Sequence, residues 1–228
     1  MLLYYITDRH QFPGSEKDRQ RRLLKKISEA ARGGVDYIQL REKDLSARQL
    51  LRLAEEARGT IADVAGSTFA TNGSQRATRL LINSRADVAL AAGADGVHLR
   101  SDDLSAAEAR AIWRQASAAG NPQLAKRNFL IASSCHRADD VRRAQVDGAD
   151  FAVFAPVFEK AGQAGIGLAA LRDACATPFN TVRIPVLALG GVTLENARAC
   201  VEAGASGIAG IRLFQENDVA EVAARLRK

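Results

Sequence analysis

Three side chains that bind oxyanions alternate in the segment Gln39-Leu40-Arg41-Glu42-Lys43. In an extended strand, alternate residues point to the same side, so Gln39, Arg41 and Lys43 are expected to share one side and Glu42 to lie on the other. An amide, a guanidinium and an ammonium group together make a strong anion clamp. The alternative interpretation is a solvated polar loop.

A second candidate anion site lies near the end of the chain. Gly190-Gly191 and Ile211-Arg212 each follow a short apolar run. Glycine lets backbone N–H groups approach phosphate oxygens closely, and Arg212 adds positive charge. The pattern predicts a phosphate site at Gly191, Ile211 and Arg212, unless the glycine pair is only a tight turn.

Further polar residues follow or end the apolar runs between these two sites, namely Asn83, Asp103 and Ser134. Asp103 is the best candidate for a Mg²⁺ ligand, because Mg²⁺ usually takes one or two carboxylates together with phosphate oxygens and water. Asp102 competes for this role. Either carboxylate could instead supply negative charge to the start of the helix expected from Ser105.

Two of the three histidines are candidates for acid–base work. His98 lies inside an apolar run and His136 lies just beyond the next one. A lone histidine is more often a hydrogen-bonded structural residue than a catalyst, and we weigh that interpretation for both. His10 is expected at the surface.

Eight short apolar runs must position all of these side chains. Each run is bounded by polar or glycine residues and alternates with a helical pattern, which predicts parallel strands joined by helices. The runs span Leu2 to Thr7, Val35 to Leu40, Arg79 to Asn83, Asp95 to Leu99, Phe129 to Ser134, Asp150 to Pro156, Pro185 to Gly190 and Ser206 to Ile211. Eight such units in 228 residues predict an α/β protein, a single-domain (β/α)8 TIM barrel over residues 1–228. The active site of this fold lies at the carboxyl ends of the strands.

The helical patterns are closed by glycine in several places, as at Gly33-Gly34, Gly93 and Gly148. The expected helices are 16–32, 46–58, 84–92, 105–119, 137–146, 168–176, 194–203 and 218–227. Residues 59–78 are rich in Gly, Ser, Thr and Ala, and we interpret them as an insertion in a helix-to-strand connection.

Composition narrows the class of protein. The formal charge of +6 is spread along the chain without a dense basic run, which argues against nucleic-acid binding and favours small anionic ligands. Three cysteines without metal-ligand spacing indicate a reduced, cytoplasmic protein. We expect no targeting peptide, and no apolar run is long enough for a membrane span. The sequence is compatible with a homo-oligomer and does not decide the oligomeric state.

The motifs together resemble the family of thiamine phosphate synthase and its sister, the TenI-type thiazole tautomerase. The matching segments run in order along almost the whole chain. They are YITD at 5–8, QLREKD at 39–44, INSR at 82–85, GADGVHL at 93–99 with Asp103, SCH at 134–136, APVF at 155–158, IPVLALGGV at 184–192 and GIAGI at 207–211.

The resemblance implies a barrel that joins hydroxymethylpyrimidine diphosphate to thiazole phosphate, with thiamine phosphate and pyrophosphate as products and Mg²⁺ as cofactor. It implies three groups of site residues. Gln39, Arg41, Lys43, Asn83 and Ser134 would hold the pyrimidine diphosphate, Asp103 would hold Mg²⁺, and Gly191, Ile211 and Arg212 would contact the thiazole phosphate.

The chain also departs from the synthase pattern. Ser84 stands where synthases normally have a second magnesium carboxylate, and Arg100 stands where glycine is usual. The Thr-x-Thr-Lys loop after the sixth strand is absent, although Lys160 could replace its lysine. Ala155 stands before Pro156 in place of the usual glycine.

These departures favour the tautomerase, in which a histidine at the position of His136 shuttles a proton. The intact clamp at Gln39, Arg41 and Lys43 favours the synthase, because a tautomerase has no diphosphate substrate. We favour the synthase by a narrow margin. A third possibility is a non-catalytic barrel that binds thiazole phosphate or thiamine phosphate and regulates.

Overall fold

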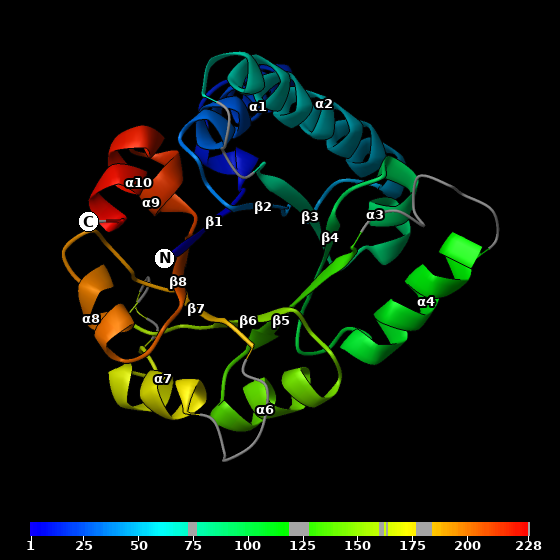
Figure 1. The fold of residues 1–228 in the computed structure, drawn as a ribbon. Helices are drawn as coiled ribbons and strands as arrows, with labels where there is room; N and C mark the ends of the chain where they lie inside the picture. The colour runs from blue at the N-terminus through cyan, green and yellow to red at the C-terminus, as the bar shows by residue number, and fades with distance from the viewer. Residues whose placement is uncertain (73–76, 119–127, 160–161, 163, 177–183, 228) are drawn as a thin grey trace.

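The computed structural model describes residues 1–72, 77–118, 128–159, 162, 164–176 and 184–227. The strands form a closed parallel barrel in chain order, with the last strand paired to the first. Figure 1 shows the strands as a central ring with the helices around it. The predicted (β/α)8 fold is therefore confirmed.

Each strand lies within the apolar run that predicts it, or extends it by one residue. The strands are β1 (Leu2–Ile6), β2 (Tyr37–Leu40), β3 (Arg79–Asn83), β4 (Gly96–Leu99), β5 (Leu130–Cys135), β6 (Phe151–Phe154), β7 (Val186–Ala188) and β8 (Gly207–Gly210). Short buried runs of this kind fit parallel strands covered on both faces.

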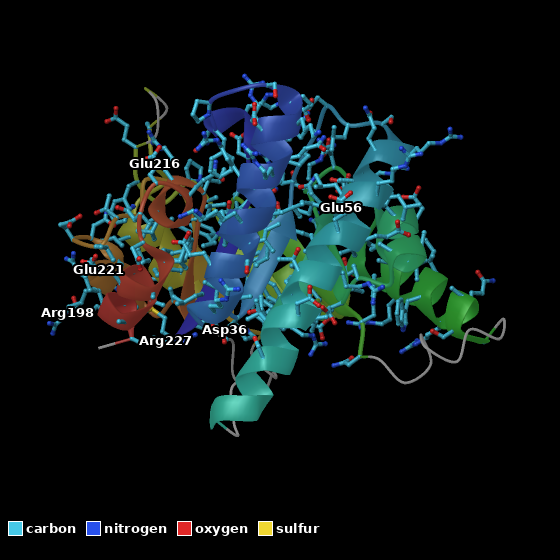
Figure 2. All side chains as sticks on the ribbon, turned by 90° about the horizontal axis from the view of Figure 1, so that it is seen from above. Asp36, Glu56, Arg198, Glu216, Glu221 and Arg227 are labelled. Carbon is cyan, nitrogen blue, oxygen red and sulfur yellow. The ribbon has the colours of Figure 1, made fainter. Side chains whose placement is uncertain are left out.

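The helices cover the outside of the ring. They are α1 (Glu16–Arg32), α2 (Ala47–Asn72), α3 (Ala86–Ala92), α4 (Ala106–Ala118), α6 (Ala138–Val146), α7 (Leu168–Cys175), α8 (Ala197–Glu202), α9 (Arg212–Gln215) and α10 (Val219–Leu226), with a 3-10 helix, η1 (Arg9–Gln11). The helix expected to end at Arg58 continues to Asn72, so the expected break at residue 59 is wrong. Figure 2 shows this helix projecting past the barrel at the edge where Asp36 and Arg227 lie.

Strand alternation divides the apolar side chains into two cores. Tyr4, Leu81, Phe151 and Leu187 belong to the cluster inside the barrel. The intervening strand residues pack outward against the helices in a larger cluster. The barrel is therefore filled by side chains, and a ligand has access only at its ends.

The described part of the chain holds no helix with the length and hydrophobicity that a membrane span requires. Cys135, Cys175 and Cys200 are all buried thiols.

Gly207 of β8 pairs with Leu2 of β1. A Cβ atom at this position would overlap the carbonyl group of Leu2. We expect Gly207→Ala to lower the free energy of unfolding by about 1–3 kcal/mol, because the two paired strands must separate. Urea denaturation measures this change.

Gly59→Ala in α2 is the matched control, because a Cβ atom at Gly59 would have no neighbour within 4 Å and the backbone there is helical. It should raise the free energy of unfolding by about 0.5–1 kcal/mol. Equal stability of the two variants would contradict the close approach at Gly207.

Candidate active site

Three predicted pyrimidine-site residues lie toward the carboxyl ends of β2, β3 and β5. Gln39 pairs in register with Ile6 of β1, and Asn83 of β3 pairs with His98 of β4. Ser134 pairs with Val153, a member of the interior cluster. Because alternate residues of a strand face the barrel interior, these three polar side chains point inward, in the layer nearest the carboxyl ends of the strands.

A chain of hydrogen-bonding contacts crosses this layer. Gln39 Nε2 donates to the Tyr4 hydroxyl at 3.1 Å, and that hydroxyl lies 3.1 Å from His98 Nδ1. His98 Nε2 lies 2.8 Å from Ser134 Oγ. Four strands, β1, β2, β4 and β5, therefore meet through one polar network.

The donor and acceptor chemistry gives the network a direction. An amide nitrogen only donates, so the Tyr4 oxygen accepts from Gln39 and its own proton is available for His98 Nδ1. His98 then carries its proton on Nε2 and donates it to Ser134 Oγ. The Ser134 hydroxyl proton is left to donate onward, toward a ligand at the barrel mouth.

Burial keeps His98 neutral in this arrangement. The pKa of His98 falls to about 3, first because the ring is desolvated and second because Arg41 is positively charged. Desolvation likewise raises the pKa of Tyr4 far above its ordinary value. Both groups therefore act as hydrogen-bonding groups rather than as charges at neutral pH, which gives His98 the structural role weighed in the sequence.

The predicted clamp residues lie directly beyond β2. Arg41 is half-buried and Lys43 is exposed, and neither side chain forms an ion pair with any described residue. The positive charge of Arg41, followed by burial and the charge of Arg100, lowers the pKa of Lys43. Arg41 and Lys43, close to each other and unpaired with any described carboxylate, form an attractive site for an anion.

The clamp loop is held by a buried arginine that sequence reasoning missed. Arg9 Nη1 contacts Glu42 Oε2 at 3.0 Å and Asp44 Oδ1 at 2.7 Å, while Arg9 Nε contacts Glu16 Oε1 at 2.7 Å. The Arg9 side chain is 2% exposed. A bidentate arginine fixes the loop geometry as well as its charge.

Glu42 completes this connection on the side opposite the clamp, as the alternation predicts. Its carboxylate accepts from Thr7 Oγ1 at 2.6 Å, and Thr7 Oγ1 accepts from the Arg41 backbone N–H at 2.9 Å. Burial raises the pKa of Glu42, whereas its bonds to Thr7 and Arg9 oppose that rise. The first strand thereby sets the position of Arg41.

The predicted phosphate site lies at a pocket of about 320 Å³ between the loops after β7 and β8. Gly190, Gly191, Ile211 and Arg212 all line it. Among the described residues, the backbone N–H groups of Gly190 and Gly191 have no hydrogen-bond acceptor. These groups and Arg212 would suit a phosphate.

The glycine pair also has a packing requirement. Gly190 and Gly191 adopt φ values of 96° and 62°. A Cβ on Gly191 would lie 2.5 Å from the Glu159 carbonyl oxygen. The tight-turn interpretation and the phosphate interpretation therefore hold together at these positions, and the roles of Gly191, Ile211 and Arg212 remain predictions.

The predicted metal ligand is already occupied by a neighbouring arginine. Asp103 Oδ2 accepts from the Arg100 backbone N–H at 2.7 Å, and Asp103 Oδ1 lies 3.6 Å from Arg100 Nε. Asp102 pairs with Arg100 Nη2 at 2.8 Å. A divalent cation at these carboxylates would lie beside a guanidinium, so the residues fit Mg²⁺ poorly in this arrangement.

His136 lies at the mouth of the barrel, between β5 and α6. Its Nδ1 is 2.7 Å from the Ala155 carbonyl oxygen, which can only accept, so Nδ1 carries a proton. Nε2 of the neutral ring then has a free lone pair. Lys160, the predicted substitute for a loop lysine, lies outside the described residues.

The direction of the polar network is testable by ¹⁵N NMR of histidine-labelled protein. We expect His98 to stay neutral with its proton on Nε2 down to about pH 4, because its pKa lies near 3. A protonated ring or the Nδ1 tautomer at pH 7 would contradict the network.

The same burial couples His98 to stability. Below the ordinary histidine pKa of 6.5, the unfolded chain binds a proton on His98, whereas the folded protein keeps the buried ring neutral until the pH nears 3. Stability from this residue is therefore complete above pH 6.5 and declines toward pH 3, by roughly 1.4 kcal/mol per pH unit. Urea denaturation should show a shallower decline in His98→Gln, and parallel pH profiles would contradict this.

Arg9→Met should lower the free energy of unfolding by about 3–5 kcal/mol, because Glu42 would be buried without its partner. Urea denaturation measures the loss. Arg21→Met, at an exposed pair with Asp18, should change it by less than about 0.5 kcal/mol. Adding Glu42→Gln to Arg9→Met should restore part of the loss, and no restoration would contradict the assigned pairing.

Comparison with known proteins shows the family of this chain. The family model of thiamine monophosphate synthase matches residues 3–214. A putative thiamine-phosphate synthase of Geobacter sulfurreducens is 41% identical, over 91% of this chain and 83% of that protein. The thiamine-phosphate synthase of Chlorobium luteolum is 37% identical, over 98% and 90%. A solved thiamine phosphate pyrophosphorylase from Pyrococcus furiosus superposes with a TM-score of 0.73 at 29% identity, covering 99% of this chain and 93% of that one. The chain belongs to the thiamine monophosphate synthase family.

Proposed function

We propose that the protein joins hydroxymethylpyrimidine diphosphate to thiazole phosphate, forming thiamine phosphate and releasing pyrophosphate. The observation that carries the proposal is a pair of anion-binding regions at one barrel mouth. Arg41 and Lys43 follow β2, and the pocket lined by Gly191 and Arg212 follows β7 and β8. Family membership supports the same reaction.

The clamp stabilises the leaving group. The bond between the pyrimidine methylene carbon and the diphosphate oxygen breaks, and its electron pair stays with the diphosphate. Arg41 and Lys43 face the oxygens on which this charge develops, and their fixed positions make the stabilisation available without rearrangement. The Arg9 contacts with Glu42 and Asp44 supply that rigidity.

Polar groups inside the mouth orient the pyrimidine. The Ser134 hydroxyl, whose proton is free to donate, suits a ring nitrogen, and the Gln39 and Asn83 amides offer oxygen acceptors for an amino group. A cationic pyrimidine intermediate is then held in place while the thiazole nitrogen attacks the methylene carbon. Orientation and charge stabilisation, rather than a strong base, account for the rate.

The pocket after β7 and β8 positions the second substrate. The Gly190 and Gly191 N–H groups and Arg212 would hold the thiazole phosphate so that its ring nitrogen faces the pyrimidine. These contacts bind the ground state and the transition state alike, so their loss should raise KM more than it lowers kcat.

The direct test measures thiamine phosphate and pyrophosphate with both substrates, in separate reactions with Mg²⁺ and with EDTA. We expect both products in equal amounts, and no pyrophosphate when thiazole phosphate is omitted. A folded protein that forms no thiamine phosphate in either reaction would contradict the synthase.

The tautomerase is the second candidate, and His136 is the observation that favours it. With Nδ1 bonded to the Ala155 carbonyl, Nε2 can accept and return a proton. Thiazole tautomerisation that His136→Ala abolishes would support this activity. Tautomerisation unchanged in that variant would rule out the role of His136. Binding of thiazole phosphate without either reaction would support a non-catalytic, regulatory barrel.

Arg41→Ala should weaken binding of hydroxymethylpyrimidine diphosphate by about ten- to a hundredfold, because a charge-assisted contact to the diphosphate is lost. Binding of thiazole phosphate should change by less than about twofold, because Arg41 does not line that pocket and β1 separates β2 from β8. Calorimetric titration of each substrate separates the two, and equal loss of both would contradict the assignment.

A further inference from the structure

We propose that Arg100 binds the diphosphate and, with Arg41 and Lys43, supplies the positive charge that Mg²⁺ would otherwise bring. The inference rests on the proposed function, because it concerns the same leaving group. It assigns to this protein a diphosphate site made of side chains alone.

Arg100 directly follows β4 and lies at the mouth of the barrel. Its guanidinium is anchored at one side by Asp102, at 2.8 Å, and by Asp103, at 3.6 Å. These contacts use only part of the five N–H donors of a guanidinium. The side chain is 45% exposed, so its remaining donors are accessible to phosphate oxygens.

Arg100 also acts on the clamp by its charge. Both Arg41 and Arg100 lower the pKa of Lys43, so the three cations lie within electrostatic reach of one another. Arg41 and Lys43 have no ion pair within the described ranges, and the Asp102 carboxylate, which raises the pKa of Lys43, offsets the effect of Arg41 and Arg100 only in part, so repulsion among the cations remains. A diphosphate among them would remove that repulsion and accept hydrogen bonds from all three.

The oxygen ligands at the same place are arranged for Arg100 rather than for a metal ion. Asp103 is 13% exposed in its side chain, and both of its oxygens face Arg100. The neighbouring strand end offers Ser84, a neutral hydroxyl that accepts from Asn83 Nδ2 at 3.1 Å.

The chemical step needs no proton and no further reactant. As the carbon–oxygen bond breaks, its electron pair moves to the diphosphate oxygen. Arg41, Lys43 and Arg100 donate hydrogen bonds to the oxygens that gain charge. A guanidinium stays protonated throughout, so its charge is constant over the working pH range.

The test measures binding of inorganic pyrophosphate by calorimetric titration, in EDTA and in Mg²⁺, with free concentrations corrected for the magnesium–pyrophosphate complex. We expect the unaltered protein to bind in EDTA, with a Kd within about threefold of that in Mg²⁺. Binding that requires Mg²⁺ would overturn the proposal.

Arg100→Gln removes the charge while it keeps much of the side-chain length. We expect it to weaken pyrophosphate binding in EDTA by about ten- to a hundredfold. Arg100→Lys should retain more affinity than Arg100→Gln, because it keeps the charge but loses the planar fork. Added Mg²⁺ should restore binding to Arg100→Gln, since Asp103 no longer faces a guanidinium.

Arg198→Gln is the matched control, because Arg198 is an exposed arginine of α8 paired only with Glu202 among the described residues (Figure 2). It should bind pyrophosphate like the unaltered protein. Arg100→Gln that binds as well as Arg198→Gln in EDTA would overturn the proposal. Thiamine phosphate formed only with Mg²⁺ would overturn it and leave the synthase intact, whereas metal-free pyrophosphate binding without thiamine phosphate would count against the synthase alone.

Discussion

The interior of the barrel has room for few side chains in each layer, and any polar group placed there must be satisfied by its neighbours. Gln39, Tyr4, His98 and Ser134 meet this constraint with a single line of contacts. Since the line begins at the Gln39 amide nitrogen, which only donates, the whole line has one direction. The chemistry of the mouth depends on that direction, because it decides which group at the rim is left with a proton to offer.

In the outer part of the mouth, one arginine is buried and paired with carboxylates, while other cations at the surface are left unpaired with any described carboxylate. Arg9 is enclosed with the carboxylates of Glu42 and Asp44, whereas Arg41 and Lys43 on the other side of the same loop have no such partner among the described residues. One loop therefore carries a neutralised face and a positive face. The first face fixes the loop, and the second is available to an anion.

The fold could be predicted because apolar runs and glycine stops are local signals. β3 and α1 match their predicted bounds, since each is bounded by turn residues and capped as the sequence indicates. The end of α2 could not be predicted in this way, because a glycine such as Gly59 is tolerated on the exposed face of a helix and its position alone does not mark an end. Segment 59–78 is thus helical through Asn72, and its interpretation as an insertion stays a prediction.

The candidate site could be predicted in part, because alternation places the strand-end amides Gln39 and Asn83 on the inner side of their strands, while the anion clamp stays a prediction. Arg9 was missed since Glu42 and Asp44 lie 33 and 35 residues away from it, and a lone arginine after a strand resembles any surface residue. The pairing of Arg100 with Asp103 was missed for another reason. Both residues stand out in the sequence, yet only the loop conformation shows that the Arg100 guanidinium and the Asp103 carboxylate pair with each other.

The buried thiols give this barrel an internal reporter of its own opening. Burial raises the pKa of Cys135 to about 12 and that of Cys200 to about 11, so the native protein presents little thiolate to solvent. Alkylating reagents attack thiolates at accessible sulfur atoms. Because Cys135 ends β5 and Cys200 lies in α8, modification of either requires the sheet and its helical cover to part. The rate at which these cysteines are alkylated in the unaltered chain therefore measures how often the barrel opens locally, without any introduced label.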